Sequence, residues 1–330
     1  MLKFPYGISD FQKIRSEGFF YVDRTDTIPL IEGIGKQLLF LRPRRFGKSL
    51  LLSMLENYYD VARAEQFEQI FGDLAIGKNP TPLHNRFLIL RWDFSTVESK
   101  GDYQQIRQSL FDHINTQISN FVRTYQSLLK DQVNIDPDNA LASFADLAGA
   151  VQRTAYRIYL LIDEYDNFAN EVLMAGSGHG RDRYEELEKG EGGKKTVFKG
   201  AKTLRSGMGV DRDFITGVSP VVMSDISSGY NVAENIYLMP EFNTLCGFPE
   251  AEVSTTRGGV ATACNFSRQQ QQDALSILRT FYNGYCFERD LRETVYNPTL
   301  VLYFLKALQQ YCKYPDELLD NNLAMDRTRI

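Results

Sequence analysis

Residues 42–49 read RPRRFGKS and lie between an apolar segment, QLLFL at 37–41, and a segment with helical spacing that follows directly. A glycine-lysine-serine triplet between a strand and a helix is typical of a phosphate-binding loop. In such a loop backbone N–H groups surround the phosphates, the lysine neutralises their outer oxygens and the serine hydroxyl ligates Mg²⁺. Gly47, Lys48 and Ser49 fill these positions. The alternative is a GKS triplet that begins a helix by chance.

The loop departs from the usual pattern at its first position. The pattern G-x-x-x-x-G-K-[ST] has glycine where this chain has Arg42, and glycine is favoured there because the backbone turns tightly. We therefore expect a modified loop entry, in which the arginines add positive charge near the phosphates. The candidate nucleotide-binding residues of this segment are Arg42, Pro43, Arg44, Arg45, Phe46, Gly47, Lys48, Ser49 and Leu50.

A second candidate lies in RIYLLIDEYD at 157–166, an apolar run that ends in adjacent carboxylates. Ligands bind at the carboxyl ends of strands in open α/β sheets, so Asp163 is placed to hold a metal. Glu164 is placed to orient and deprotonate an attacking water, which predicts hydrolysis in addition to binding. The alternative is a solvated strand end, which is often acidic. For Asp166 we favour a turn residue over a supporting role at the site.

The segment DFITGVS at 213–219 ends in further hydroxyl groups. Thr216 and Ser219 are candidates for sensing the γ-phosphate beside the nucleophilic water. Ordinary turn chemistry explains them equally well.

Short apolar runs that alternate with helical segments must position these residues, and this alternation predicts a parallel sheet with helices on both faces. A further run, RFLILRW, lies between the loop strand and the acidic strand, an arrangement typical of the P-loop class that carries a catalytic glutamate. The expected strands are 37–41, 86–92, 157–163, 213–219 and 235–239.

Helical spacing after the loop strand and later in the chain predicts helices over 50–62, 103–130, 139–156 (with Asp138 or Asn139 as cap), 250–253, 269–285 and 297–312. The stretch 174–210 is rich in Gly, Lys and Glu and is interpreted as a mobile insertion. These patterns divide the chain into a P-loop core with an N-terminal extension, 1–245, and a smaller lid-like helical subdomain, 246–330.

Composition excludes several classes of protein. The chain has 330 residues, 43% of them hydrophobic, which indicates a globular protein. A net charge of −5 supplies no global attraction to nucleic acid or to an anionic membrane. No stretch approaches the roughly 18 apolar residues of a membrane helix. The 4 cysteines form no C-x-x-C pair, so we expect free thiols, neither a zinc site nor a disulfide framework, and a cytoplasmic location.

With these residues assembled, the chain resembles the AAA-ATPase-like family of bacterial and archaeal proteins. That family is similar to AAA+ and STAND ATPases and often carries a PD-(D/E)XK nuclease-like domain behind the ATPase. The similarity extends over nearly the whole chain, and the RPRRFGKS form with Arg42 is a family trait. The segments on which the resemblance rests are FPYGISDFQKIRSEGFFYVDRT at 4–25, FLRPRRFGKSLLLSML at 40–55, LLIDEYD at 160–166, FITGVSP at 214–220, FYNGYCF at 281–287 and VYNPTLVLYFL at 295–305.

The resemblance implies ATP and Mg²⁺ as ligands and an ASCE/AAA-like strand order. It implies that Lys48 and Ser49 bind phosphate and metal, that Asp163 binds metal and that Glu164 is the catalytic acid. It also implies an N-terminal segment near the adenine, with Tyr21 and Asp23 as candidates.

This chain departs from the family pattern in two motifs. It has Asn283 and Cys286 where Asp and Arg or another polar residue are expected, and Pro220 where an arginine is expected. A nuclease-like domain would begin after about residue 330 on the family plan, so we expect this chain to comprise the ATPase half.

Three functions follow from these features. The first is an Mg²⁺-dependent ATPase whose cycle drives a conformational change in the helical subdomain or in an attached effector. The second is a slow nucleotide-gated switch that retains ATP or ADP. The third is the ATPase half of a nucleic-acid processing or defence nuclease, which the acidic balance weighs against for this chain alone. A homo-oligomer, an arginine supplied by a neighbour and direct contact with nucleic acid are left open.

Overall fold

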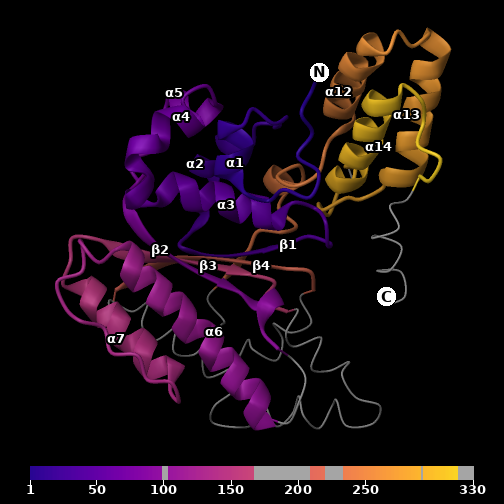
Figure 1. The fold of residues 1–330 in the computed structure, drawn as a ribbon. Coiled ribbons are helices and arrows are strands. Elements are labelled where there is room, and N and C mark those ends of the chain that lie inside the picture. Colours follow the sequence, from indigo (N-terminus) through magenta and orange to yellow (C-terminus); the bar gives the residue numbers. More distant parts are fainter. Residues whose placement is uncertain (99–102, 167–208, 220–232, 291–292, 319–330) are drawn as a thin grey trace. The chain divides into compact units, whose positions relative to one another are not determined.

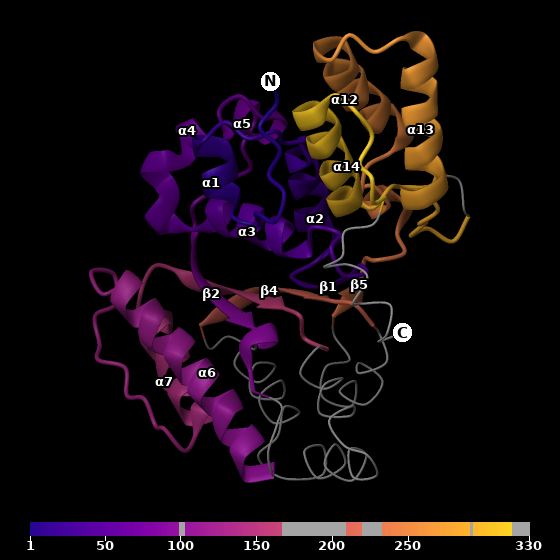
Figure 2. The ribbon, with the colours of Figure 1, turned by 45° about the vertical axis from the view of Figure 1, so that its right-hand side comes forward.

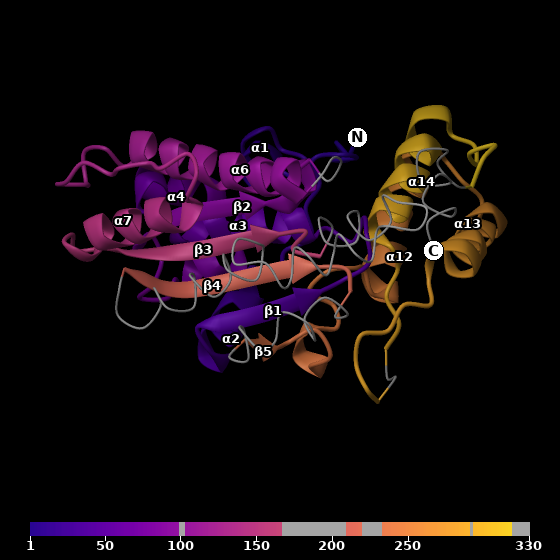
Figure 3. The ribbon, with the colours of Figure 1, turned by 90° about the horizontal axis from the view of Figure 1, so that it is seen from below.

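A parallel sheet is the central element of the computed structural model, which describes residues 1–98, 103–166, 209–219, 233–290 and 293–318. Within these residues the strand order is β2-β3-β4-β1-β5, and every neighbouring pair is parallel (Figure 3). This confirms the predicted α/β fold with a sheet flanked by helices. The strands are β1 (Gln37–Leu41), β2 (Phe87–Asp93), β3 (Arg157–Asp163), β4 (Val210–Gly217) and β5 (Glu234–Asn235).

The sheet order adds a detail that the order along the chain does not contain. In space β4 separates β1 from β3, whereas β2, the segment that intervenes along the chain, is an edge strand. The ends of β1, β4 and β3 therefore lie side by side at the carboxyl edge of the sheet. This edge is where ligands bind in open parallel sheets.

Two expected strands differ in the structure. The segment 235–239 is not a strand: β5 ends at Asn235, and the chain turns at 237–238 before a 3₁₀ helix that begins at Pro240. The strand expected at 213–219 instead spans 210–217, because the backbone N–H groups of the next two residues bond to a carboxylate described below.

The expected helices are found, with shifted ends. They are α3 (Lys48–Tyr59), α6 (Tyr103–Thr124), α7 (Ala140–Gln152), α12 (Glu250–Ala263), α13 (Arg268–Tyr282) and α14 (Pro298–Tyr311). Of the two caps expected for α7, Asn139 is the one observed. The described part of the chain also contains the short helices α1 (Phe11–Ser16), α2 (Ile28–Ile34), α4 (Phe67–Phe71) and α5 (Ala75–Lys78). None of the described helices is both long and apolar enough to cross a bilayer.

The chain separates into two compact units. The sheet unit comprises Ile28–Pro43 and Leu55–Ile236, and the helical unit comprises Met1–Thr27, Arg44–Met54 and Tyr237–Ile330. Helix α3 begins in the helical unit and ends in the sheet unit. The division into 1–245 and 246–330 stays a prediction.

In the sheet unit, helices cover both faces of the sheet. Helices α6 and α7 lie on one face, and α2, α4 and α5 lie on the other (Figures 1 and 2). The strands are buried on both sides, which explains why they are continuous apolar runs and do not alternate. Trp92 of β2 packs against Phe144 of α7, with ring centroids 5.1 Å apart.

In the helical unit, α12, α13 and α14 surround a core that includes Phe4 from the N-terminal segment. The N-terminal segment is held here by Arg24, whose guanidinium makes two 2.6 Å bonds to the carboxylate of Glu252 on α12. The same guanidinium donates to the carbonyls of Thr244 and Gly247. The segment 1–27 and the C-terminal helices therefore fold as one body, although they are far apart in sequence.

The expectation of free thiols is wrong for two of the cysteines. Cys264 and Cys312 form a disulfide, while Cys246 and Cys286 are free. The pair joins the C-caps of α12 and α14, two helices that pack on each other. Sequence spacing did not reveal the bond because helix packing, not chain separation, brings the sulfur atoms together.

Candidate functional site

The loop at 42–49, called here the phosphate loop, connects the carboxyl end of β1 to the first residue of α3. Lys48 begins the helix, and the Leu51 N–H donates to the Gly47 carbonyl at 3.0 Å. Gly47 has φ 90° and Arg45 has φ 68°, both in the left-handed region. Gly47 is suited to this conformation, whereas a residue with a side chain adopts it at a cost.

Arg42 occupies the position where the usual loop has glycine, and its side chain turns back onto the sheet. It is buried, its guanidinium lies 4.3 Å from the ring centroid of Phe40, and it donates to the Leu41 carbonyl at 2.8 Å. Its N–H donates to the Gly217 carbonyl at 3.1 Å, so β1–β4 pairing extends into the loop entry. The modified entry is therefore a continuation of the sheet.

The remaining loop residues differ in exposure. Arg44, Arg45 and Gly47 are exposed, Pro43, Ser49 and Leu50 are half-buried, and Lys48 is buried. Phe46 is buried between exposed neighbours and packs against aromatic side chains of the C-terminal part of the chain.

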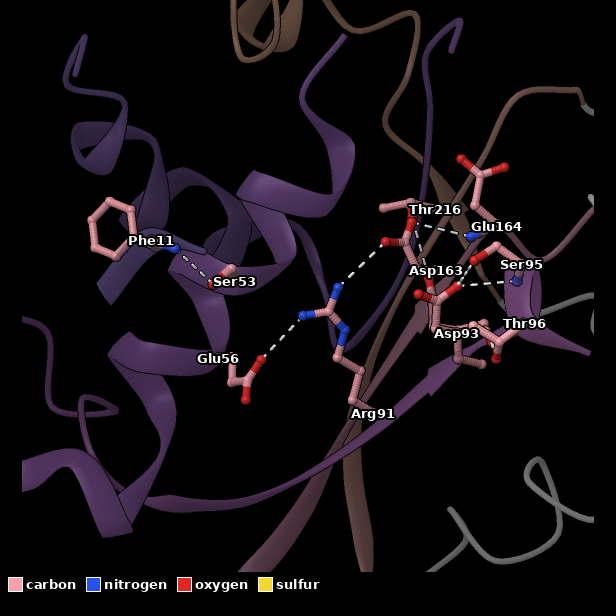
Figure 4. Close-up of polar contacts among 11 residues, drawn as sticks. Phe11, Ser53, Glu56, Arg91, Asp93, Ser95, Thr96, Asp163, Glu164 and Thr216 are labelled. Carbon is pink, nitrogen blue, oxygen red and sulfur yellow. Dashed lines mark hydrogen bonds and ion pairs between the residues drawn. The ribbon is translucent and has the colours of Figure 1, made fainter. Parts of the chain in front are cut away.

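The acidic strand end is organised around Asp163, which is 1% exposed. Its Oδ1 accepts from the Thr216 hydroxyl at 2.6 Å and from the Glu164 N–H at 3.1 Å (Figure 4). Hydrogen bonds to an ionised carboxylate are stronger than those between neutral groups. Thr216, expected as a possible γ-phosphate sensor, therefore orients Asp163 in this structure.

Sequence reasoning missed Arg91, on β2. Its guanidinium lies between two carboxylates, with Nη2 3.4 Å from Asp163 Oδ2 and Nη1 3.3 Å from Glu56 Oε2 of α3 (Figure 4). A signal was available, because Arg91 is the one charged residue in the apolar run from 87 to 92. A charge inside a buried strand usually has a partner.

Glu164 follows Asp163 in the left-handed conformation, with φ 51°. Its side chain is half-buried and points away from Arg91 in the close-up (Figure 4). The next residue, Tyr165, returns to the sheet by donating its N–H to the Thr216 carbonyl at 3.1 Å. Strained backbone of this kind persists where its surroundings hold it, as they do here on both sides.

Asp166 lies in a turn, as the sequence favoured. Its buried carboxylate accepts from the N–H groups of Val218 at 3.0 Å and Ser219 at 2.6 Å, and so fixes the chain after β4. The Tyr165 hydroxyl donates to the Ser219 carbonyl. A Cβ on Gly217 would lie 2.4 Å from the Tyr165 ring, which explains the glycine.

The two N-terminal candidates lie in the helical unit. Tyr21 packs edge-on against Phe11, at 5.2 Å between centroids, and its hydroxyl contacts the Met54 sulfur of α3 at 3.4 Å. Burial raises the pKa of Tyr21 far above its usual value. Asp23 accepts from the N–H and the hydroxyl of Thr25 at 2.8 and 2.7 Å, and so caps a 3₁₀ turn.

The residues of the two motifs are chemically suited to Mg²⁺. A serine hydroxyl and a carboxylate are hard oxygen ligands, and Mg²⁺ is usually held by one or two carboxylates together with substrate phosphates. Within the described ranges no group of three or more His, Cys, Asp or Glu side chains forms a metal cluster.

At two of the positions where the chain departs from the family pattern, the structure shows the local contacts. Asn283 accepts from the Gly284 N–H through its side chain at 2.8 Å, and the Cys286 sulfur lies 3.8 Å from the Glu288 carbonyl. Pro220 and all but the end of the expected insertion at 174–210 lie outside the described residues.

Comparison with known proteins matches this chain to a family and to a relative. The family described as "Predicted AAA-ATPase" matches residues 5–227. A protein of Azotobacter chroococcum mcd 1, described as an uncharacterized protein in the vnfD 5' region, is 28% identical over 316 residues, which are 92% of this chain and 52% of the relative. The chain thus spans about half the length of this curated relative.

Proposed function

The chain belongs to the predicted AAA-ATPase family, and we propose that it binds ATP with Mg²⁺ and hydrolyses the γ-phosphate. The observation that carries this proposal is the RPRRFGKS loop between β1 and α3, with Lys48 as the first residue of a helix of 12 residues. The N-terminus of a helix attracts phosphate, because its N–H groups are unpaired and its dipole is positive there.

The loop residues have separate roles in this proposal. The backbone of 44–49 donates hydrogen bonds to phosphate oxygens, and Lys48 neutralises negative charge on the outer phosphates. Ser49 supplies a hydroxyl ligand to the metal. Bound Mg²⁺ neutralises the phosphate oxygens and the charge that develops on the leaving group.

The acidic residues supply the remaining chemistry. Asp163, held by the Thr216 hydroxyl, offers a carboxylate oxygen to the metal. Glu164 accepts the proton of a water whose oxygen attacks the γ-phosphorus, while the bond from that phosphorus to the bridging oxygen breaks and ADP leaves. Hydrolysis then drives a conformational change in the C-terminal helices or in an attached effector.

Phosphate release from ATP tests the proposal. Wild-type protein with ATP and Mg²⁺ is expected to release phosphate, and Lys48→Ala and Glu164→Gln are expected to abolish it. Glu164→Gln should still bind nucleotide, because the amide keeps the shape of the side chain. Lys36→Ala is a matched control, since that lysine is exposed and pairs with Asp211. The ATPase proposal is refuted by equal rates of phosphate release in the wild type and in both site variants, once the need for a partner protein has been excluded.

A nucleotide-gated switch is the second candidate, and the ion pair between Arg91 and Asp163 favours it. A metal ligand that is already paired with a cation has to exchange partners when the metal binds, which suits slow turnover. A switch predicts nucleotide retained through purification, and assembly that requires ATP but not its hydrolysis. A rapid ATPase without retained nucleotide contradicts it.

The wider setting of the chain is also proposed. We place residues 1–245 as the ATPase core and 246–330 as a lid-like subdomain, in a cytoplasmic protein with a nuclease-like effector in a longer chain. A homo-oligomer is compatible with this plan. The support is the family membership and the relative, which is about twice as long as this chain.

A further inference from the structure

The phosphate loop contains one large apolar side chain, Phe46, and this side chain is buried. Phe46 is 1% exposed, although Arg45 and Gly47 on either side are exposed. Both neighbours have left-handed backbone conformations, with φ 68° at Arg45 and φ 90° at Gly47. The loop is therefore attached to the protein through a side chain that has no part in phosphate chemistry.

Phe46 contacts the motif FYNGYCF, to which the proposed function assigns no role. Its ring packs edge-on against Tyr285, at 4.7 Å and 72°, and against Phe287, at 5.3 Å and 89°. The latter two rings are nearly parallel to one another. Edge-to-face packing is the favoured geometry of aromatic pairs, so the contact defines the orientation of Phe46. All these residues belong to the helical unit.

A second contact holds the loop backbone beside Phe46. The hydroxyl of Thr299, in the first turn of α14, donates to the Arg45 carbonyl at 2.6 Å. This bond is made to the residue whose backbone is strained, with φ 68°. It therefore stabilises the conformation that the loop needs.

The surface that contacts the loop is itself stabilised by hydrogen bonds, and we call its described residues, 282–290 and 293–299, the dock. Tyr285 and Val295 exchange backbone hydrogen bonds across it, at 2.7 and 3.4 Å. Asn297 donates its N–H to the Tyr282 carbonyl at 2.9 Å, and its side chain caps α14. The dock thus connects the end of α13 to the start of α14.

We propose that the dock sets the conformation of the phosphate loop, with Phe46, Tyr285 and Thr299 as positioning residues for nucleotide binding. FYNGYCF is then an aromatic anchor for the loop and not a polar site, which explains why Asn283 and Cys286 are tolerated there. Because coupling is reciprocal, nucleotide bound to the loop stabilises the dock in turn. The inference rests on the proposed function, since it concerns nucleotide binding by the same loop.

The direct test measures the affinity for a fluorescent non-hydrolysable ATP analogue with Mg²⁺. Tyr285→Leu lies outside the loop and is expected to weaken binding about tenfold. Phe46→Leu should do the same, and the double variant should lose much less than the product of the single losses, because both remove one contact. Thr299→Val, which removes a single hydroxyl, should weaken binding less than either.

The matched control is Phe266→Leu, which removes an aromatic contact with Tyr314 in the same unit. It should lower the unfolding temperature as Tyr285→Leu does but leave the affinity unchanged. Equal loss of affinity in Phe266→Leu and Tyr285→Leu overturns the proposal, because it assigns the effect to general destabilisation. Affinities within twofold of wild type in all of Phe46→Leu, Tyr285→Leu and Thr299→Val overturn it as well.

Hydrogen exchange of the nucleotide-free protein separates this inference from the proposed function. In Tyr285→Leu the amides of residues 44–49 are expected to exchange about tenfold faster than in the wild type. Unchanged exchange contradicts the dock whether or not nucleotide binds. A wild type that binds no nucleotide refutes the proposed function, while faster loop exchange in the variant still supports the dock.

Discussion

Replacing Arg91 with glutamine isolates the cation that faces Asp163. The guanidinium is 3.4 Å from Asp163 Oδ2 and 3.3 Å from Glu56 Oε2, and glutamine removes the charge while keeping a polar side chain. Asp163 then retains the Thr216 hydroxyl and the Glu164 N–H as hydrogen-bond donors, but it remains almost fully buried. We expect the nucleotide-free protein to lose stability.

The size of the loss follows from burial. Removing one partner of a fully buried pair costs about 3–5 kcal/mol, and removing a fully exposed pair costs about 0–1 kcal/mol. Asp163 belongs to the first case, whereas the Arg91 side chain is 30% exposed and its contact is long. An intermediate value of about 2 kcal/mol is expected, which lowers the melting temperature by about 4–8 °C for a domain of this size.

The loss of stability is measured by thermal unfolding with and without Mg²⁺ and a non-hydrolysable ATP analogue. The difference in melting temperature between Arg91→Gln and the wild type should be smaller when both ligands are present, because a divalent cation replaces the missing charge beside Asp163. Arg153→Gln, which breaks an exposed pair with Asp131, is the control and should melt within about 2 °C of wild type. An Arg91→Gln protein that melts like the wild type refutes the reasoning, since Asp163 would then not need the guanidinium.

Three more predictions concern Thr216, Gly217 and His113. Thr216→Val deletes the 2.6 Å hydrogen bond to Asp163 and should lower phosphate release about tenfold, about 1.4 kcal/mol in the barrier, while Thr216→Ser keeps the activity. Gly217→Ala places a Cβ 2.4 Å from the Tyr165 ring and should reduce the free energy of unfolding in urea by about 1–3 kcal/mol; an unchanged midpoint contradicts the close approach. Burial lowers the pKa of His113 from its ordinary 6.5, so the folded chain binds this proton more weakly than the unfolded chain. The associated stability is present above pH 6.5 and is lost as the pH falls through the folded pKa. Urea midpoints between about pH 5 and about pH 8 should therefore vary less in His113→Gln than in the wild type.

Features that depend on neighbouring residues could be predicted from the sequence. Buried parallel strands are continuous apolar runs, so β1 and β3 were expected with their observed bounds. Capping depends on side chains within one helical turn, so a cap was expected at Asp138 or Asn139, and Asn139 is the N-cap of α7. The segment 235–239 was also apolar and β-forming, but it turns before Pro240, which shows that an apolar run does not by itself secure a place in the sheet.

By itself the sequence determined the kinds of groups that can do chemistry and the elements that carry them: a lysine and a serine at the start of a helix, and an acidic pair at the end of a strand. The tertiary structure decided what those groups contact. Arg91 and Asp163 are 72 residues apart, Thr216 and Asp163 are 53 apart, and Phe46 meets Tyr285 from opposite parts of the chain. The physical reason is that capping and strand burial act over a few residues, whereas these contacts require the order of strands in the sheet and the packing of helices to be settled first.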